Sequence, residues 1–305
     1  SSSSTLSSSF HVNDSNNLSE AMISSEIMNS SSSQDNISYK VIAFQLFYAK
    51  IASAEQMDKL THLIYFSVLP NYDGGVDDAE VVKEDLKYLT DEMHKRNKKI
   101  LISVGGWGRS TGFEWLLKDP ITYKKLTNDL IAYVIDNDLD GLDLDWEYPA
   151  IAGFPNHRFT PADKPNFREL IKALRQQLGK KATITFAAGG FKKFAEQAVN
   201  WSDVMPLINY VNLMTYDLVG GYSTVTGHHS PLYSTSKQKE SADNCIQYLL
   251  SLGVPAKKMI IGAAFYARTW EGVSEDNNGL YQKGKFKSYI GYNEFLKRIS
   301  EKDGF

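Results

Sequence analysis

From residue 39 onward, short apolar runs alternate with longer amphipathic stretches, and this alternation limits the possible folds more than any other feature of the chain. Such apolar runs predict buried strands, whereas the stretches between them carry apolar residues at the three-to-four spacing of a helix face. The expected strands span residues 41–49, 62–69, 99–107, 141–149, 182–189, 210–218 and 258–268. A regular succession of strand and helix indicates a parallel sheet with helical crossovers.

The expected helices each have one apolar stripe. The stripes are Val82, Leu86, Leu89 and Met93; Tyr123, Leu126, Leu130 and Val134; and Phe167, Leu170, Leu174 and Leu178. Asp119 is expected to start the second of these helices, because the proline that follows fills a first-turn position whose amide needs no partner. A last helix is expected at residues 292–299, and the segment before it is expected to be too short for a separate α+β unit.

Two folds are compatible with this order of elements, an open doubly wound sheet and a closed barrel. No Gly-x-Gly-x-x-Gly turn follows the first strand, so a dinucleotide-binding sheet is disfavoured. We therefore predict an α/β fold of the (β/α)8 TIM barrel type. In such a barrel the carboxyl ends of all the strands meet at one mouth. The residues expected at those ends are Trp107, Glu147, Asp217 and Arg268.

The fourth expected strand contains acidic residues at every second position, Asp143, Asp145 and Glu147. Since alternate side chains of a strand point to the same side, the three carboxyl groups would share one face. The other face would carry Leu142, Leu144 and Trp146. Crowded carboxyl groups raise one another's pKa, which can keep one of them protonated near neutral pH as a general acid. The alternative is a calcium loop or a solvated acidic face, although neither suits a strand rich in leucine and aromatic residues.

Composition excludes several other classes of protein. The net charge is -3 and the basic residues are scattered, so no nucleic-acid partner is expected. No apolar stretch approaches the length of a membrane span, about 20 residues. Cys245 is the only cysteine, so neither an internal disulfide nor a structural zinc site is expected, and its helical context predicts a buried packing residue. We expect no metal, no cofactor and a monomeric protein.

Serine dominates residues 1–38, where aromatic residues are almost absent. Such a stretch buries too little apolar surface to offset the entropy lost on ordering, so we expect a disordered tether. Residues 39–305 would then form the folded domain. A serine-rich tether leading into a folded domain is typical of secreted or surface-anchored enzymes, and this is the location that we expect.

Four acidic residues, Asp140, Asp143, Asp145 and Glu147, stand in the pattern Asp-x-x-Asp-x-Asp-x-Glu, which resembles the fourth-strand motif of family-18 glycoside hydrolases, the chitinase family. Three further segments resemble motifs of that family, in the same order along the chain. They are Ser103-Val-Gly-Gly-Trp107 for the third strand, Met214-Thr-Tyr-Asp217 for the sixth and Phe265-Tyr-Ala-Arg268 for the seventh. The resemblance implies a (β/α)8 barrel that hydrolyses glycosidic bonds.

In this family the acetamido group of the substrate acts as the nucleophile, so the resemblance implies a retaining, substrate-assisted mechanism. Glu147 would be the general acid for the glycosidic oxygen. Asp145 would accept a hydrogen bond from the acetamide N–H, and Asp143 would share a proton with Asp145. Tyr216 would hold the acetamido oxygen. Two alternatives stay open, a purely structural role for Asp143 and simple packing of Tyr216.

The resemblance also implies residues that contact sugar. They are Gly106, Trp107, Met214, Asp217, Tyr266 and Arg268. Asp217 could instead cap a helix, and Arg268 could form a surface ion pair. Trp270 is expected as a further wall of the sugar-binding groove. The tryptophans expected in the core are Trp115 and Trp201.

The chain departs from the family pattern in two places. Phe44 stands where the family usually has a tyrosine inside the first strand, so one hydroxyl near the acids is expected to be missing. No eighth strand is found before residue 305, and we expect either that the sequence is a fragment or that another segment completes the barrel. Strands one and seven would then keep unpaired edges. His228 and His229 are expected to position a loop and not to bind a metal.

Three functions follow from the resemblance. The segment Trp146-Glu147-Tyr148-Pro149 favours the chitinase branch, which hydrolyses β-1,4-linked N-acetylglucosamine polymers such as chitin or chitooligosaccharides. The second is an endo-β-N-acetylglucosaminidase that acts on glycoprotein glycans, or a glucosaminidase that acts on peptidoglycan. The third is a non-catalytic chitin-binding lectin, and the presence of Glu147 disfavours it.

Overall fold

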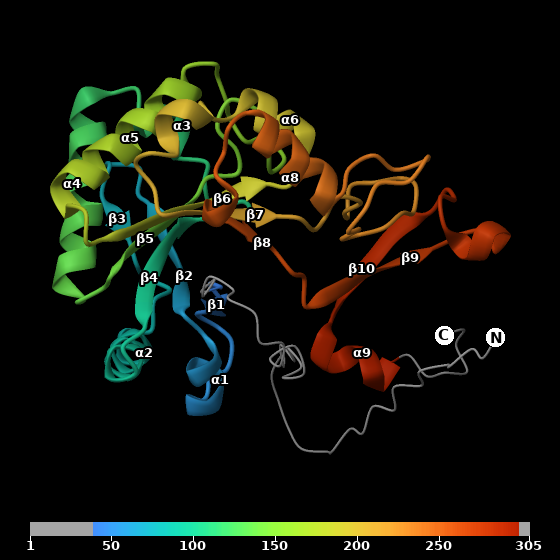
Figure 1. The fold of residues 1–305 in the computed structure, drawn as a ribbon, viewed down its shortest axis with the longest axis horizontal. Coiled ribbons are helices and arrows are strands. Elements are labelled where there is room, and N and C mark those ends of the chain that lie inside the picture. Colours follow the sequence, from blue (N-terminus) through green and yellow to red (C-terminus); the bar gives the residue numbers. More distant parts are fainter. Residues whose placement is uncertain (1–38, 299–305) are drawn as a thin grey trace, which may run out of the picture.

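The main sheet of the protein is parallel and curled, and its strands follow the order of the chain (Figure 1). The computed structural model describes residues 39–298, so the expected tether at residues 1–38 lies outside the described residues. The strands of the path are β1 (Ile42–Leu46), β2 (His62–Pro70), β4 (Lys99–Gly105), β5 (Gly141–Asp145), β6 (Thr183–Gly189), β7 (Tyr210–Met214) and β8 (Met259–Ile261). The short β3 (Val76–Asp77) pairs antiparallel with the end of β2. The expected parallel α/β architecture is confirmed.

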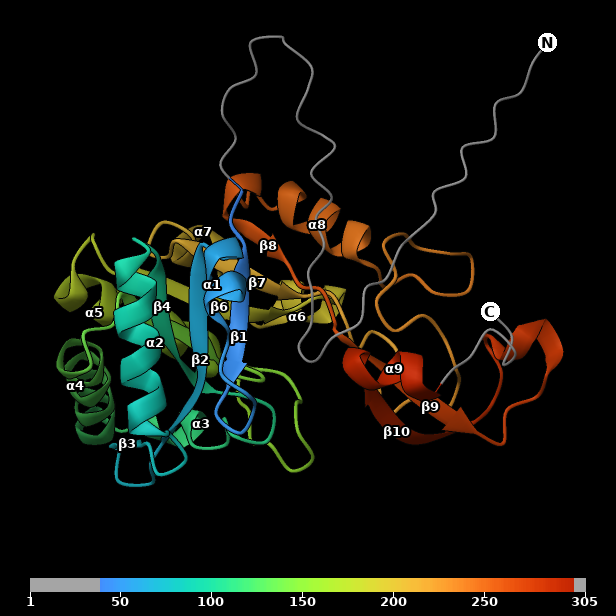
Figure 2. The same cartoon turned by 90° about the horizontal axis from the view of Figure 1, so that it is seen from below.

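Helices lie between consecutive strands and cover the outer face of the sheet (Figure 2). They are α1 (Ala54–Lys59), α2 (Lys83–Lys95), α3 (Phe113–Leu116), α4 (Pro120–Asp136), α5 (Asp163–Leu178), α6 (Lys192–Gln197), α7 (Trp201–Val204), α8 (Ala242–Ser251) and the 3-10 turn η2 (Ala256–Lys258). Helix α4 begins as expected, because Asp119 Oδ1 accepts hydrogen bonds from the amides of Ile121 and Thr122, both at 2.9 Å. None of the described helices is both long enough and apolar enough to cross a bilayer.

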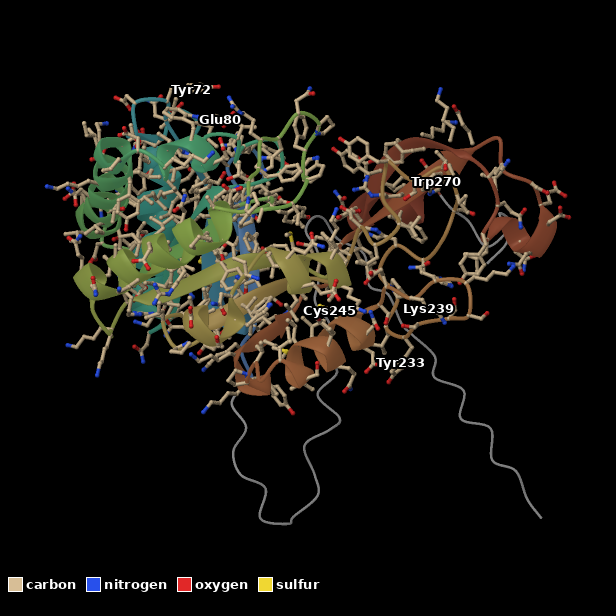
Figure 3. All side chains as sticks on the ribbon, turned by 90° about the horizontal axis from the view of Figure 1, so that it is seen from above. Tyr72, Glu80, Tyr233, Lys239, Cys245 and Trp270 are labelled. Atoms are coloured by element: carbon tan, nitrogen blue, oxygen red, sulfur yellow. The ribbon has the colours of Figure 1, made fainter. Side chains whose placement is uncertain are left out.

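The core lies between the sheet and these helices, and Trp146 next to β5 belongs to it. Trp146 stacks on Phe113 with ring centroids 5.1 Å apart and meets the edge of Phe167 at 6.0 Å. The expected apolar face of β5 is thereby confirmed, and so is the burial of Trp201 and Cys245. Trp115 was also expected in the core; it is half-buried and packs against the edge of the core cluster. Its ring stacks on the exposed ring of Tyr72, 6.0 Å away, at the rim of the molecule (Figure 3).

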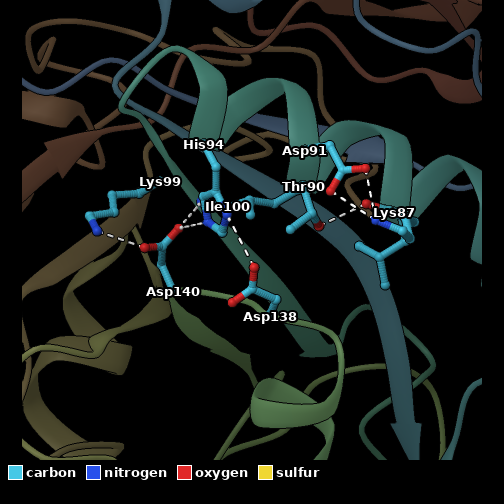
Figure 4. A network of polar contacts seen from close by, with 9 residues as sticks. Lys87, Thr90, Asp91, His94, Lys99, Ile100, Asp138 and Asp140 are labelled. Atoms are coloured by element: carbon cyan, nitrogen blue, oxygen red, sulfur yellow. Dashed lines mark hydrogen bonds and ion pairs between the residues drawn. The ribbon is translucent and has the colours of Figure 1, made fainter.

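Asp140, the first acid of the β5 motif, ties the amino ends of β4 and β5 together (Figure 4). Its Oδ2 accepts a hydrogen bond from the amide of Ile100 at 2.9 Å and lies 3.0 Å from His94 Nε2, while its Oδ1 accepts from Lys99 Nζ at 2.6 Å. Asp138 approaches the other nitrogen of the His94 ring at 3.5 Å. Asp140 therefore lies at the opposite end of the strand from the mouth, where it fixes the strand.

The seventh expected strand, residues 258–268, is wrong as a single strand. Only β8 joins the main sheet, and its ladder ends where the amide of Gly262 donates to the carbonyl of Leu213 at 2.8 Å. The chain then leaves the sheet, and β9 (Tyr266–Glu271) pairs antiparallel with β10 (Lys285–Gly291). The hairpin, with the 3-10 turn η3 (Asp276–Gly279) and helix α9 (Tyr292–Arg298), stands beside the main body (Figure 1). The segment before the final helix was expected to be too short for an α+β unit; it forms this two-stranded hairpin, and the final helix is found where expected.

The two ends of the parallel path remain open. In the described part of the chain, no pairing joins β1 to β8. Phe44 on β1 is 41% exposed and Ile261 on β8 is 56% exposed, although both belong to strands of the main sheet. The expected unpaired edges are thus present, and the fold is an incomplete barrel of the (β/α)8 type.

Candidate active site

The three acids of the β5 motif are buried at the carboxyl end of the strand. Asp143 and Asp145 lie on β5, and Glu147 follows two residues after its end. Their exposed fractions are 0%, 6% and 7% in that order. A solvated acidic face is therefore excluded. A calcium loop is not supported either, since no group of His, Cys, Asp and Glu side chains within residues 39–298 is placed to hold a metal ion.

Asp143 is surrounded by hydrogen-bond donors from the neighbouring strands. Its carboxylate accepts from Thr185 Oγ1 at 2.5 Å, from Asn212 Nδ2 at 2.9 Å and from Ser103 Oγ at 3.5 Å. Complete burial raises the pKa of Asp143 to about 6, and these donors limit the rise because they stabilise the charged form. The same donors place Asp143 in the middle of β4, β5, β6 and β7.

Asp145 and Glu147 have fewer partners and a stronger preference for the protonated form. Burial raises the pKa of Asp145 well above its usual range, and the charges of Glu147 and Asp143 add to the rise. Its Oδ1 has no hydrogen-bond partner among the described residues. Burial also raises the pKa of Glu147 to about 7; a hydrogen bond from Tyr148 opposes this rise, and the charge of Asp217 supports it. The expected mutual effect of crowded carboxyl groups is present at Asp145, but burial is the larger cause.

Tyr216 lies just after β7 and close to the acids. Burial raises the pKa of its phenol, and the charges of Asp145 and Glu147 are the next largest causes. Its ring packs so closely over Gly262 that an added Cβ there would lie 2.8 Å from a ring carbon. The neighbouring Thr215 Oγ1 donates to the carbonyl of Gly262 at 2.7 Å, which fixes the end of β7 against the end of β8. Tyr216 therefore faces the same space as the two acids.

Asp217, the next residue, carries the opposite electrostatic character. Burial would raise its pKa, but contacts with His229, Arg268 and Tyr266 hold it well below its usual range. Tyr266 Oη donates to Oδ2 at 2.7 Å, Arg268 Nε donates to Oδ1, and His229 Nδ1 lies 3.2 Å from Oδ1. Tyr266 and Arg268 were placed on the seventh barrel strand, which is wrong; they lie on β9, and the hairpin carries them to the mouth. The expected alternative of an ion pair for Arg268 is present, with Asp217 as its partner.

The other expected sugar-contacting residues follow β4, end β7 or lie on the hairpin. Trp107 is 41% exposed, and its ring lies 5.8 Å from Phe154 and 6.0 Å from Tyr222. Gly106 adopts a φ of +116°, and its amide donates to the carbonyl of Asp145 at 2.8 Å, so it also shapes the strand end. Met214 is half-buried at the end of β7. Trp270, on the hairpin, packs edge-on against Phe286 at 6.2 Å (Figure 3).

Several residues near the acids were not singled out from the sequence. Asn212 left a signal, because it is a polar residue in a largely apolar strand, whereas Thr185 is paired with Asp143 by the β5–β6 register, which only the structure gives. Ser110 had no such signal: it lies in a loop, where its Oγ donates to the carbonyl of Gly106 and accepts from the amide of Glu147 at 3.2 Å. Loop residues are brought to a site by tertiary structure and leave no periodic pattern.

The chain matches the family model described as "Glycosyl hydrolases family 18" over residues 29–303. Chitinase A1 of Niallia circulans is 31% identical over 211 residues, which cover 64% of this chain and 30% of that protein. Human oviduct-specific glycoprotein is 30% identical over 265 residues, which cover 79% of this chain and 37% of that protein. The chain therefore spans less than half the length of these curated relatives.

Two solved structures resemble the fold closely. A glycoside hydrolase family 18 N-acetylglucosaminidase from Paenibacillus barengoltzii has a TM-score of 0.78 and 29% identity, with 88% of this chain and 81% of that chain covered. Chitinase ChiW from a Paenibacillus strain, described as cell-surface-expressed, has a TM-score of 0.75 and 30% identity, with 85% and 34% covered. Fold and site together define a barrel protein with buried acids at its mouth. The chain belongs to family 18 of the glycosyl hydrolases.

Proposed function

We propose that this protein hydrolyses β-1,4-linked N-acetylglucosamine polymers, chitin or chitooligosaccharides. The observation that carries the proposal is the pairing of two acids with different surroundings at the mouth. Glu147, with a pKa of about 7, holds a proton near neutral pH, while Oδ1 of the adjacent Asp145 is buried and free to accept a hydrogen bond. The similarity to proteins named chitinases supports the choice of polymer.

In the proposed reaction, Glu147 donates its proton to the glycosidic oxygen as the bond to the anomeric carbon breaks. The acetamido oxygen of the same sugar attacks the anomeric carbon and forms a cyclic oxazolinium-like intermediate. Water then adds to that carbon and returns a proton to Glu147, so the anomeric configuration is retained. Because the nucleophile belongs to the substrate, the enzyme supplies one acid–base group and electrostatic stabilisation.

Asp145 would stabilise the intermediate by accepting a hydrogen bond from the acetamide N–H through its open Oδ1. Asp143, held by Thr185 and Asn212, would exchange a proton with Asp145 and so set its charge. Tyr216 would donate its phenol proton to the acetamido oxygen, because the raised pKa of that phenol keeps it protonated. These roles match the residues' burial and their mutual proximity.

We further propose that the residues around the acids bind sugar. The set is Gly106, Trp107, Met214, Asp217, Tyr266 and Arg268. Trp107 offers an exposed ring for the apolar face of a pyranose, and Asp217 offers a carboxylate that Arg268 keeps charged. The likeness to a chitinase described as cell-surface-expressed supports a secreted or surface-exposed location.

The test compares substrates side by side. The protein is incubated with chitooligosaccharides, a glycoprotein and peptidoglycan, with Glu147→Gln as the control for contaminating hydrolases. We expect N-acetylated products from the chitooligosaccharides, with the β anomer formed first in a time-resolved NMR spectrum. Cleavage of the glycoprotein or peptidoglycan alone would overturn the choice of substrate, and an α anomer formed first would overturn the mechanism.

A further inference from the structure

The loop that joins β5 to α5 folds back over the main chain that follows Glu147. His157, 7% exposed, points its Nε2 at the backbone of Tyr148, at 2.9 Å from the carbonyl oxygen and 3.2 Å from the amide nitrogen. An imidazole nitrogen donates when it is protonated and accepts when it is not. With or without a proton on Nε2, the ring can therefore form one of these two hydrogen bonds.

The same loop is held tightly along its length. Gly153 lies so close to Glu147 that an added Cβ would be 2.1 Å from the Glu147 carbonyl oxygen. Asp163 is fully buried, and its Oδ2 accepts hydrogen bonds from the amides of Ala150 at 3.1 Å and Thr160 at 2.9 Å, at the two ends of the loop. The loop therefore has one defined path, and that path brings His157 to Tyr148.

Tyr148 connects this loop to the acid. Its phenol donates a hydrogen bond to the Glu147 carboxyl group, and its ring packs edge-on against Phe191 and Phe194 at 5.5 Å each. On the other side, Ser110 Oγ accepts from the amide of Glu147. The main chain around the acid is thus held before Glu147 by Ser110 and after it by His157.

We propose that His157 is a positioning residue for the general acid, which it orients by holding the main chain of Tyr148. This inference rests on the proposed function in assigning the acid role to Glu147. Within the described residues, the hydrogen bonds of the His157 ring go to the main chain of Tyr148 and not to the carboxyl group, so His157 acts through Tyr148. If the contact is lost, Tyr148 turns, its phenol leaves the carboxyl group, and water enters beside Glu147. Loss of the Tyr148 hydrogen bond alone would raise the pKa of Glu147, but the relief of burial, which is the largest cause of the raised pKa, lowers it by more.

Two variants separate hydrogen bonding from packing. His157→Phe keeps a ring in the loop without a nitrogen, whereas His157→Gln keeps a polar group that donates and accepts. Arg158→Ala is the matched control, because the Arg158 side chain is 77% exposed in the same loop. The titration of Glu147 is followed by 13C NMR in protein labelled at glutamate Cδ, with Glu147→Gln for assignment. Turnover of a chitooligosaccharide is measured in parallel.

We expect His157→Phe to lower the Glu147 titration midpoint from about 7 by about one unit or more and to reduce kcat about tenfold or more, with KM within about twofold. His157→Gln should retain most of the wild-type titration and rate, and Arg158→Ala all of it. A folded His157→Phe that titrates and turns over like the wild type would overturn the proposal. So would loss of the native fold in both His157 variants, which would assign the residue to folding.

The two readouts distinguish this inference from the proposed function. The NMR titration requires no substrate, so it decides on His157 even if the wild-type protein cleaves none of the sugars. Absence of turnover in the wild type would count against the proposed function alone. A changed titration in His157→Phe with an unchanged one in Arg158→Ala would still show that His157 controls the surroundings of Glu147.

Discussion

Asp145 on β5 and Glu147 just after it lie at the same opening as Asp217, which follows β7. The acids of the two strands nevertheless differ in protonation. Burial favours the neutral form of every one of these carboxyl groups. Among the described residues, no cation pairs with Asp145 or Glu147, so burial decides and their pKa values rise. Asp217 is bonded to Arg268, Tyr266 and His229, which outweigh burial. The comparison teaches that His229 and the partners brought by β9, and not depth alone, decide which acid keeps its proton.

Packing also differs between the strands that surround the buried acids and the strands on the Arg268 side. Every residue of β5 and β6 is buried, whereas β8 and β9 have no fully buried residue. The acids that must be held in one orientation therefore lie on the most constrained strand. Tyr266 and Arg268, two of the residues proposed to bind sugar, come from the more exposed side, where the hairpin can approach a long substrate.

The largest difference between Glu147 and Asp217 is expected in catalysis. Glu147→Gln should reduce kcat by about 10³-fold, because it removes the proton donor, whereas Asp217→Asn should reduce it by about tenfold or less. Steady-state rates on a chitooligosaccharide at the optimal pH measure both. Equal losses of kcat in the two variants would contradict the assignment of proton donation to Glu147 and of sugar binding to Asp217.

The packing comparison predicts unequal losses of stability. Leu144→Ala on β5 should lower the free energy of unfolding by about 2–5 kcal/mol, because the leucine is fully buried and leaves a cavity. Ile261→Ala on β8 removes a side chain of similar size that is 56% exposed, and it should lower that free energy by less than about 1 kcal/mol. Denaturant melts of the two variants test this. A larger loss at Ile261 would mean that the edge strand is covered in solution.

Much of this arrangement could be predicted from the sequence, because it depends on local pattern. The alternation of runs predicted the parallel sheet, and the parity of β5 separated the acids from Leu142, Leu144 and Trp146. The prediction of a single strand at residues 258–268 was wrong because an apolar stretch has the same pattern in both cases. It can continue one strand, or it can leave the sheet, as this one does at Gly262. Periodicity reports burial and says little about which sheet a strand joins.

The site was predictable in its residues but not in its energetics. The motif indicated Glu147 and Asp145, yet the main cause of their raised pKa is burial, which depends on the tertiary structure around them. The contacts of Asp143 with Thr185 and Asn212 need the strand register, which a single sequence does not give. His157 lies in a loop without periodicity, so only the tertiary structure brings it to Tyr148.

The raised pKa of Glu147 also predicts how stability depends on pH. Below about pH 4.5, the ordinary pKa of a glutamate, Glu147 is protonated in both the folded and the unfolded chain. Its contribution to the free energy of unfolding is then fully present. As pH rises to about 7, the unfolded chain releases the proton first, so folding loses about 3 kcal/mol. Glu147→Gln removes this titration. The variant should therefore gain about that much on the wild type between pH 4 and pH 8 in denaturant melts, and a constant difference would contradict the burial of an uncompensated acid.

The smallest effect is the influence of Asp217 on Glu147 across the mouth. The general acid must be protonated, so kcat/KM should fall above the Glu147 pKa of about 7. The negative charge of Asp217 helps to hold that pKa up, so Asp217→Asn should move the basic limb to lower pH, by up to about one unit. Asp91→Asn, the same change on the exposed face of α2, should leave the limb in place. Since salt screens exposed charges, the shift should shrink between about 0.01 M and 1 M ionic strength. A basic limb that stays fixed in Asp217→Asn, or moves to higher pH, would mean that the two regions titrate independently and that Asp217 serves only to bind sugar.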